Sequence, residues 1–189
     1  MIVEGLCTTR NPDDSTNIAP MGPVVDAGLT EFRFRPFRTS TTFQNLQSTG
    51  YGVFHITDDV RMIAEAAVGH LQLLPVLQPA LKIPGRVIAS ACRWYEFEVV
   101  SIDDSDERTE IATRILHTGH LRDYFGLNRA KHACVEAAIL ATRTHLLPAS
   151  EIEAELQRLA VLVTKTGGEA EQAAFDFLRT TIAQAGQSR

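Results

Sequence analysis

The chain changes its pattern of apolar residues near residue 120, and this change limits the folds open to it. Before that point, short β-prone segments are separated by Gly, Pro and Asx turns, and residues 29–35 alternate, with Phe32 and Phe34 on one face. After it, apolar residues recur at helical spacing, which predicts helices over 129–146, 151–165 and 169–184. Strands followed by helices indicate a mainly β, α+β fold, and short strands with polar turns favour a small antiparallel barrel.

The same change of pattern predicts how the chain is organised. A length of 189 residues suits one domain, or one domain with a small appendage. We therefore expect residues 1–120 to form the barrel core. Residues 121–189 are expected to form a helical extension packed on that core, so that the two make a single structural unit.

Several local signals predict where elements begin and end. Residues 2–9 and 16–25 flank the turn-forming run 11–15 and are predicted to form a hairpin. Residues 86–102 are expected to be one long β-prone stretch, and the proline-broken segment 69–85 a loop. Helix starts are predicted at three polar residues by their capping chemistry, namely Asp58, Asn128 and Ser150, the last with the capping-box partner Glu153.

Composition narrows the classes of function. With 18 basic and 23 acidic residues, the net charge is −5, so the basic footprint of a nucleic-acid-binding protein is missing. Neither a membrane-spanning apolar run nor a signal peptide is recognisable, and Cys7, Cys92 and Cys134 are read as reduced thiols, so a cytoplasmic protein without membrane or nucleic-acid partners is expected. His117 and His120 lack nearby Cys or carboxylate partners, so no metal site is predicted.

The run of hydroxyl residues from Thr39 to Thr42 could bind a phosphate group. It follows Arg38 and leads into a predicted short helix near Thr41 or Thr42. Hydroxyls, a guanidinium and free N–H groups at a helix start are the donors that a phosphate needs. The alternative is a Ser/Thr-rich loop in which one hydroxyl caps the helix.

A second segment, from Asn17 to Gly22, carries two features that interrupt a regular strand. Pro20 removes a ladder N–H, and Gly22 lets another group approach closely. Exposed backbone at such a break could hydrogen-bond the carbonyl and imide edge of a planar ligand. The alternative is an edge strand with a bulge.

Taken together, these segments carry a resemblance to a known family. The order Asn17-Ile18-Ala19-Pro20 and then Thr41-Thr42-Phe43-Gln44-Asn45-Leu46 resembles the flavin-reductase-like, FMN-binding split-barrel proteins. Four segments, namely 35–42, 52–59, 92–97 and 125–132, make nearly the whole chain similar to the domain of unknown function 447 family within that superfamily. The resemblance implies an FMN-binding split β-barrel of antiparallel, Greek-key type with a C-terminal helical segment.

The resemblance also implies a set of cofactor-binding residues. Ser40, Thr41, Thr42 and Asn45 match the phosphate-binding region, with Arg38 and Thr39 adjacent, and Asn17, Ala19 and Pro20 match the ring-facing strand. Met21, also counted as cofactor-binding, and Gly22 stand where typical flavin reductases often have a small hydroxyl residue, which leaves the contacts at the ring edge open. No catalytic acid or base is assigned.

The expected function is that of an FMN-binding flavoprotein, read as an oxidoreductase whose hydride or electron chemistry belongs to the flavin. A non-catalytic flavin- or small-ligand-binding module is the alternative. The resemblance further implies a homodimer and a small-molecule, flavin or pterin electron partner, since members of the family occur beside tetrahydromethanopterin-linked one-carbon metabolism.

Overall fold

The computed structural model describes residues 1–187, and tertiary contacts divide them into two compact units. The first unit contains residues 1–57 and 74–124, and the second contains residues 58–73 and the chain from Phe125 onward. The segment 58–73, which lies within the predicted barrel core, belongs to the second unit together with the chain from Phe125 onward.

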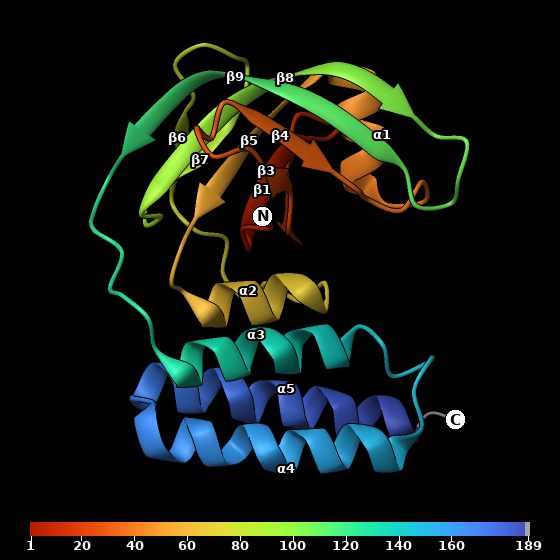
Figure 1. Ribbon diagram of the computed structural model, residues 1–189, viewed down its shortest axis with the longest axis vertical. Helices are drawn as coiled ribbons and strands as arrows, with labels where there is room; N and C mark the ends of the chain where they lie inside the picture. Colours follow the sequence, from red (N-terminus) through yellow and green to blue (C-terminus); the bar gives the residue numbers. More distant parts are fainter. Residues whose placement is uncertain (188–189) are drawn as a thin grey trace. The chain divides into compact units, whose positions relative to one another are not determined.

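The first unit is built around one antiparallel sheet (Figure 1). Its strands are β1 (Gly5–Arg10), β2 (Thr16–Met21), β3 (Val24–Val25), β4 (Glu31–Phe34), β5 (Tyr51–Ile56), β8 (Arg93–Asp103) and β9 (Glu110–His120). They are ordered β2-β1-β5-β8-β9-β4-β3, and helix α1 (Thr41–Thr49) connects β4 to β5. A two-stranded hairpin, β6 (Leu77–Pro79) with β7 (Arg86–Ile88), completes the unit.

The sheet curls so far that the residues before β1 reach β3 at one end of the sheet. Ile2, just before β1, forms an isolated antiparallel bridge with Val24 of β3, and the N–H of Val25 donates to the carbonyl of Met1 at 2.8 Å. β8 and β9 supply most of the curvature and carry two register shifts, which are the usual means of bending a strand pair (Figure 1). The result is the split barrel that the sequence predicts.

The barrel interior is aromatic. Phe32, Phe34, Phe54, Tyr95 and Phe97 are buried together, and their ring centroids lie 4.9–6.3 Å apart in tilted and edge-on pairs. The alternation predicted for residues 29–35 therefore faces Phe32 and Phe34 into the core.

The segment 69–88 differs from its predicted form. The expected loop contains β6, and the expected long strand is divided into β7 and β8 by residues 89–92. The hairpin β6–β7 packs on the outer face of the sheet, where Val87 and Ile83 meet Val53 and Trp94. The prolines end the short strands but do not prevent them from pairing.

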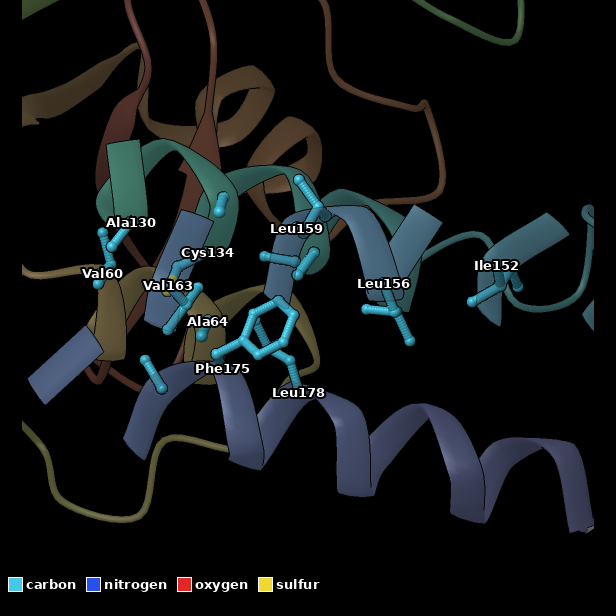
Figure 2. Close-up of a cluster of buried hydrophobic side chains, with 14 residues drawn as sticks. Val60, Ala64, Ala130, Cys134, Ile152, Leu156, Leu159, Val163, Phe175 and Leu178 are labelled. Atoms are coloured by element: carbon cyan, nitrogen blue, oxygen red, sulfur yellow. The ribbon is translucent and has the colours of Figure 1, made fainter. Parts of the chain in front are cut away.

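The second unit is helical and has its own core. It contains α2 (Val60–Ala67), α3 (Arg129–Ala141), α4 (Ala149–Thr166) and α5 (Glu169–Gln187). Figure 2 shows side chains from the helices converging, with Leu159 and Val163 of α4 against Phe175 and Leu178 of α5 and Cys134 of α3. The apolar stripes predicted for these helices are buried against one another within this unit.

Helix starts agree with the predictions in part. Asn128 caps α3, its Oδ1 accepting from the N–H groups of Ala130 and Lys131. Asp59, one residue later than predicted, caps α2. The capping box predicted at Ser150 is wrong, because α4 begins at Ala149, and Pro148 is the N-cap residue and provides no side-chain cap.

Candidate functional site

The predicted phosphate-binding segment forms the start of helix α1, as expected. Ser40 is the N-cap residue, and its Oγ accepts a hydrogen bond from the N–H of Phe43 at 3.2 Å. The capping role that the sequence left as the alternative is therefore real for Ser40. The Ser40 cap satisfies only one N–H group of the first turn, so the other N–H groups there need acceptors of their own.

Two of those N–H groups are free. Within residues 1–187, the backbone N–H groups of Thr41 and Thr42 have no acceptor. The side chains of Arg38, Thr39 and Thr41 are exposed beside them. The Arg38 side chain makes one long contact, 3.3 Å from its Nη1 to the carbonyl of Asp104, so it is loosely held in place and still has donors to spare. This end of α1 thus offers the donors that an anion needs.

The other predicted residues of this segment point inward. Thr42 and Asn45 are buried, and they meet Asn17 of β2 through a hydrogen-bond network. Nδ2 of Asn17 donates to Oγ1 of Thr42 and to Oγ1 of Thr9, both at 3.1 Å, and Nδ2 of Asn45 donates to the same Thr9 oxygen at 3.0 Å. The structure therefore connects the predicted ring-facing strand to the predicted phosphate-binding turn.

Strand β2 lies at one end of the sheet order and carries the remaining predicted residues. Ala19, Pro20 and Met21 are half-buried and pair with β1 on one side only. Along the other side, the backbone is not used by a strand ladder, which leaves donors and acceptors for a ligand. A Cβ on Gly22 would lie 2.9 Å from the carboxylate oxygens of Glu4, so the close approach predicted for this glycine is to a side chain of the same chain.

Two residues of the network were not predicted. Thr9 accepts from both asparagines, and Asn11 accepts from Nδ2 of Asn45 at 2.7 Å. The hairpin register pairs Thr9 directly with Asn17, so the contact between these two residues could have been predicted from the hairpin. Asn11 lies in the turn region, where an Asn is ordinarily explained by turn geometry alone.

A cavity of about 290 Å³ adjoins this region. Its lining includes Thr41, Gln44 and Asn45 of α1, together with Arg10 and Asn11 at the β1–β2 turn. Two predicted residues, Thr41 and Asn45, therefore share one concave surface. Arg38, Thr39 and Ser40 are not part of that lining.

Other reactive side chains are taken up by structural roles. Burial raises the pKa of the Cys7 thiol to about 12, which removes its nucleophilicity at neutral pH. All three cysteines are free and buried. His120 lies 3.2 Å from Asp123, and among the described residues no group of three His, Cys, Asp or Glu side chains is placed to hold a metal ion.

Comparison with known protein families identifies the family to which the chain belongs. Residues 3–122 match the N-terminal domain, and residues 128–180 the C-terminal part, of a family described as "Protein of unknown function (DUF447)". The chain belongs to the DUF447 family. The match covers both units described above, so the family resemblance extends from the barrel through the helical segment.

Solved structures agree with the assignment to DUF447 at the level of the fold. An FMN-bound DUF447 protein from Methanosarcina mazei matches with a TM-score of 0.81 and 21% identity, over 95% of this chain and 94% of that one. An FMN-binding protein from Thermus thermophilus (TM-score 0.54, 10% identity) matches over 62% of this chain and 70% of its own. The 2-nitrobenzoate 2-nitroreductase of Pseudomonas fluorescens (TM-score 0.52, 16% identity) matches over 62% and 64%. The flavin-reductase-like split barrel is thus the fold of this DUF447 chain.

Two further searches gave negative results. A search of curated proteins finds no match. In the described part of the chain, none of the helices has the length and apolar character needed to cross a membrane.

Proposed function

We propose that this chain binds FMN and serves as a flavin-dependent oxidoreductase. The observation that carries the proposal is the start of α1, where the unpaired N–H groups of Thr41 and Thr42 lie beside the exposed side chains of Arg38 and Thr39. Unpaired donors at a helix start, together with a guanidinium, suit a phosphate monoester. The FMN-bound relative of the same family and fold supports the choice of ligand.

In this proposal the predicted residues divide into two roles. Arg38, Thr39 and Thr41, with the free N–H groups of the helix start, would contact the phosphate group. Ser40 holds the first turn in place by capping it, which keeps those N–H groups pointing outward. The half-buried face of β2 at Ala19, Pro20 and Met21 would lie against the flavin ring.

The proposed site would be held in position by three residues that do not contact the ligand, namely Asn17, Thr42 and Asn45. Through Thr9, their amide and hydroxyl groups hold β2 and α1 at a fixed separation. A ligand that binds the strand with its ring and the helix with its phosphate needs that separation to be constant. These residues would therefore act on affinity by preorganisation and not by direct contact.

When bound, FMN would supply the hydride or electron transfer, and the chain would bind, orient and shield the ring. A small molecule, a flavin or a pterin is the proposed electron partner, because the redox chemistry of such molecules matches that of FMN.

The test is a comparison of two ligands. Flavin fluorescence would be titrated with FMN and with riboflavin, which lacks the phosphate, for wild type, Arg38→Gln and Thr41→Val. Loss of one charge-assisted hydrogen bond, about 1–3 kcal/mol, should weaken FMN binding by roughly 5- to 150-fold and leave riboflavin unchanged. Arg179→Gln, at an exposed arginine of α5, is the matched control. An equal loss for both ligands would contradict a phosphate site here.

Turnover separates the two open functions. Oxidation of NADH or NADPH, or of a reduced pterin, by the FMN-loaded protein would support an oxidoreductase. The non-catalytic module would be favoured by a different result. In that result the protein binds FMN stoichiometrically, but none of these donors reduces the bound FMN faster than it reduces free FMN.

We also propose that the chain forms a homodimer. Leu74 and Val76, which precede β6, are about three-quarters exposed, at 74% and 77%. Large apolar side chains exposed close together, here separated by one proline, are typical of a surface that a partner covers. Sedimentation should give a particle of twice 20.8 kDa, and Leu74→Ser with Val76→Ser should shift it to the monomer. A monomeric wild type at micromolar concentration would refute the proposal.

A further inference from the structure

A second and larger cavity lies next to the smaller one and shares Arg10, Asp14 and Thr49 with its lining. It has a volume of about 380 Å³, and none of the residues assigned to the phosphate or the flavin ring lines it. On one side its lining comes from β1, β2 and the start of β5, and on the other from residues 79–86 of the β6–β7 hairpin. Its size falls in the lower part of the range for small-molecule sites, which is about 300–1,000 Å³.

Three polar side chains in this lining have nothing to bind within the protein. Among residues 1–187, the hydroxyl of Thr16, the phenol of Tyr51 and the guanidinium of Arg86 form no hydrogen bond or ion pair. They come from three separate strands, β2, β5 and β7. Their meeting at one cavity therefore depends on the fold and not on neighbouring positions in the sequence.

The charges of the lining leave one cation without a counterion. Arg10 is paired with Asp14, its Nε lying 2.7 Å from the carboxylate, so this pair is neutral as a whole. Arg86 has no such partner. The lining as a whole therefore carries one net positive charge, which suits a ligand with one negative charge.

The wall that carries Arg86 is fixed to the sheet by buried polar groups. Nε2 of His55 accepts from the N–H of Ile88 at 3.0 Å, and Oγ1 of Thr8 donates to the carbonyl of Arg86 at 2.6 Å. The fully buried carboxylate of Glu96 accepts from the N–H groups of Leu81 and Lys82 at 2.8 and 2.6 Å. These bonds hold both ends of the hairpin, so the cavity is formed before any ligand arrives.

The rest of the hairpin wall is apolar. Pro79, Ala80, Ile83 and Pro84 line the cavity there. Prolines lose little entropy when a ligand covers them, because their backbone is already restricted. An acid group near Arg86 could thus be accompanied by a compact apolar body against this wall.

We propose that this cavity is a binding site for a small organic carboxylate, with Arg86 binding the carboxylate and the residues 79–84 contacting the apolar part. A carboxylate carries the single negative charge that the lining lacks, and the planar guanidinium fork matches its two oxygens. The site goes beyond the proposed FMN site, and its test does not depend on FMN binding.

The experiment measures binding of benzoate by calorimetry, to protein alone and to protein saturated with FMN. Two probes of similar size change the charge, namely benzamide, which is neutral, and phenyl phosphate, which is close to doubly charged. We expect benzoate to bind at both FMN levels and benzamide to bind roughly tenfold more weakly or worse. Phenyl phosphate should bind no better than benzoate, because one cation cannot balance two charges.

Two variants and a control locate the site. Arg86→Gln should weaken benzoate binding roughly tenfold, and Ala80→Phe should abolish it by filling the cavity. Arg93→Gln, at an exposed arginine outside the lining, should bind as wild type does. Thermal melting of each variant confirms that it is folded.

Three results would overturn the proposal. The first is that benzoate does not bind, and the second is that Arg86→Gln and Arg93→Gln bind it equally. The third is competition, in which benzoate displaces FMN one for one, since that would place benzoate in the FMN site. Failure of FMN to bind would leave the benzoate result unaffected, so the two proposals fail separately.

Discussion

His55 gives the protein a pH-dependent stability that can be worked out from the structure. The side chain is buried on β5, with Nδ1 at 3.2 Å from the carbonyl of Leu6 and Nε2 accepting from the N–H of Ile88 at 3.0 Å. Only the neutral ring with its proton on Nδ1 satisfies both contacts, because a protonated ring would aim a second donor at the Ile88 N–H. Burial lowers the pKa of His55 from 6.5 to about 4.

The sign and size of the effect follow from that difference. Above pH 6.5 the ring is neutral in the folded and the unfolded chain, so the contribution to stability is complete. As the pH falls from 6.5 toward 4, the unfolded chain takes up a proton that the folded chain does not, and the free energy of unfolding decreases. Between pH 7.5 and pH 5 the decrease from this one group is about 2 kcal/mol.

The assay is urea unfolding at pH 7.5 and pH 5 for wild type and His55→Gln. A glutamine amide can donate to Leu6 and accept from Ile88 but does not titrate, so the pH-dependent loss should shrink by about 2 kcal/mol in this variant. His132→Gln, at an exposed histidine of α3, should keep the wild-type dependence. An unchanged dependence in His55→Gln would refute the assignment of a neutral, buried ring.

Three further predictions concern buried contacts. Thr9→Val should lower the free energy of unfolding by about 1–3 kcal/mol in urea, because it leaves amide hydrogens of two asparagines unpaired, whereas the exposed control Thr118→Val should stay within about 0.5 kcal/mol of wild type. Glu96→Gln should speed hydrogen exchange at the Leu81 and Lys82 amides by roughly tenfold or more, because a carboxamide has one acceptor oxygen where the carboxylate has two, and Glu98→Gln should not. Gly119→Ala should destabilise the barrel by about 1–3 kcal/mol and shift the fluorescence of the single tryptophan, since the new Cβ would overlap the Trp94 ring. An alanine variant with wild-type stability and spectrum would contradict that close contact.

Most of the fold could be predicted from the sequence, because local sequence patterns determine most of its strands, turns and helices. The turn at 11–15 predicts the β1–β2 hairpin, and alternation at Phe32 and Phe34 predicts the inward face of β4. Asn128 caps α3 as its side-chain chemistry predicts. These features depend on residues within one or two turns of each other, and such signals survive without knowledge of the tertiary structure.

The parts of the fold that were predicted wrongly depend on other kinds of interaction. The hairpin β6–β7 is a pair of three-residue strands whose stability comes from the sheet beneath it, through His55, Glu96 and Thr8. His55 and Thr8 lie far from the hairpin in the sequence, and nothing in the local pattern marks Glu96 as its partner, so the proline content favoured a loop. At α4 the helix begins at Ala149, one residue before Ser150, so Ser150 lies inside the first turn and cannot act as the N-cap.

The candidate site was predicted as a set of residue types, but not as an arrangement. Thr39, Ser40, Thr41 and Thr42 look equivalent in the sequence, and all four are predicted there as cofactor-binding residues. The structure separates them, since Ser40 caps the helix, Thr41 is exposed and Thr42 is buried against Asn17. Thr41 and Thr42 separate because successive residues of a helix point about 100° apart, so the four hydroxyls do not all face one ligand.

This separation determines how substitutions in the run should be interpreted. Removing the exposed Thr41 hydroxyl takes away a donor from the ligand and leaves the folded chain as it was. Removing the buried Thr42 hydroxyl leaves a donor hydrogen of Asn17 without its acceptor, and so disturbs the link between β2 and α1 before any ligand is present. A loss of FMN affinity accompanied by a lower melting temperature of the ligand-free protein is therefore the expected signature of Thr42. A loss of affinity at constant melting temperature is the signature of Thr41, and only the second kind of result identifies a residue that contacts the phosphate.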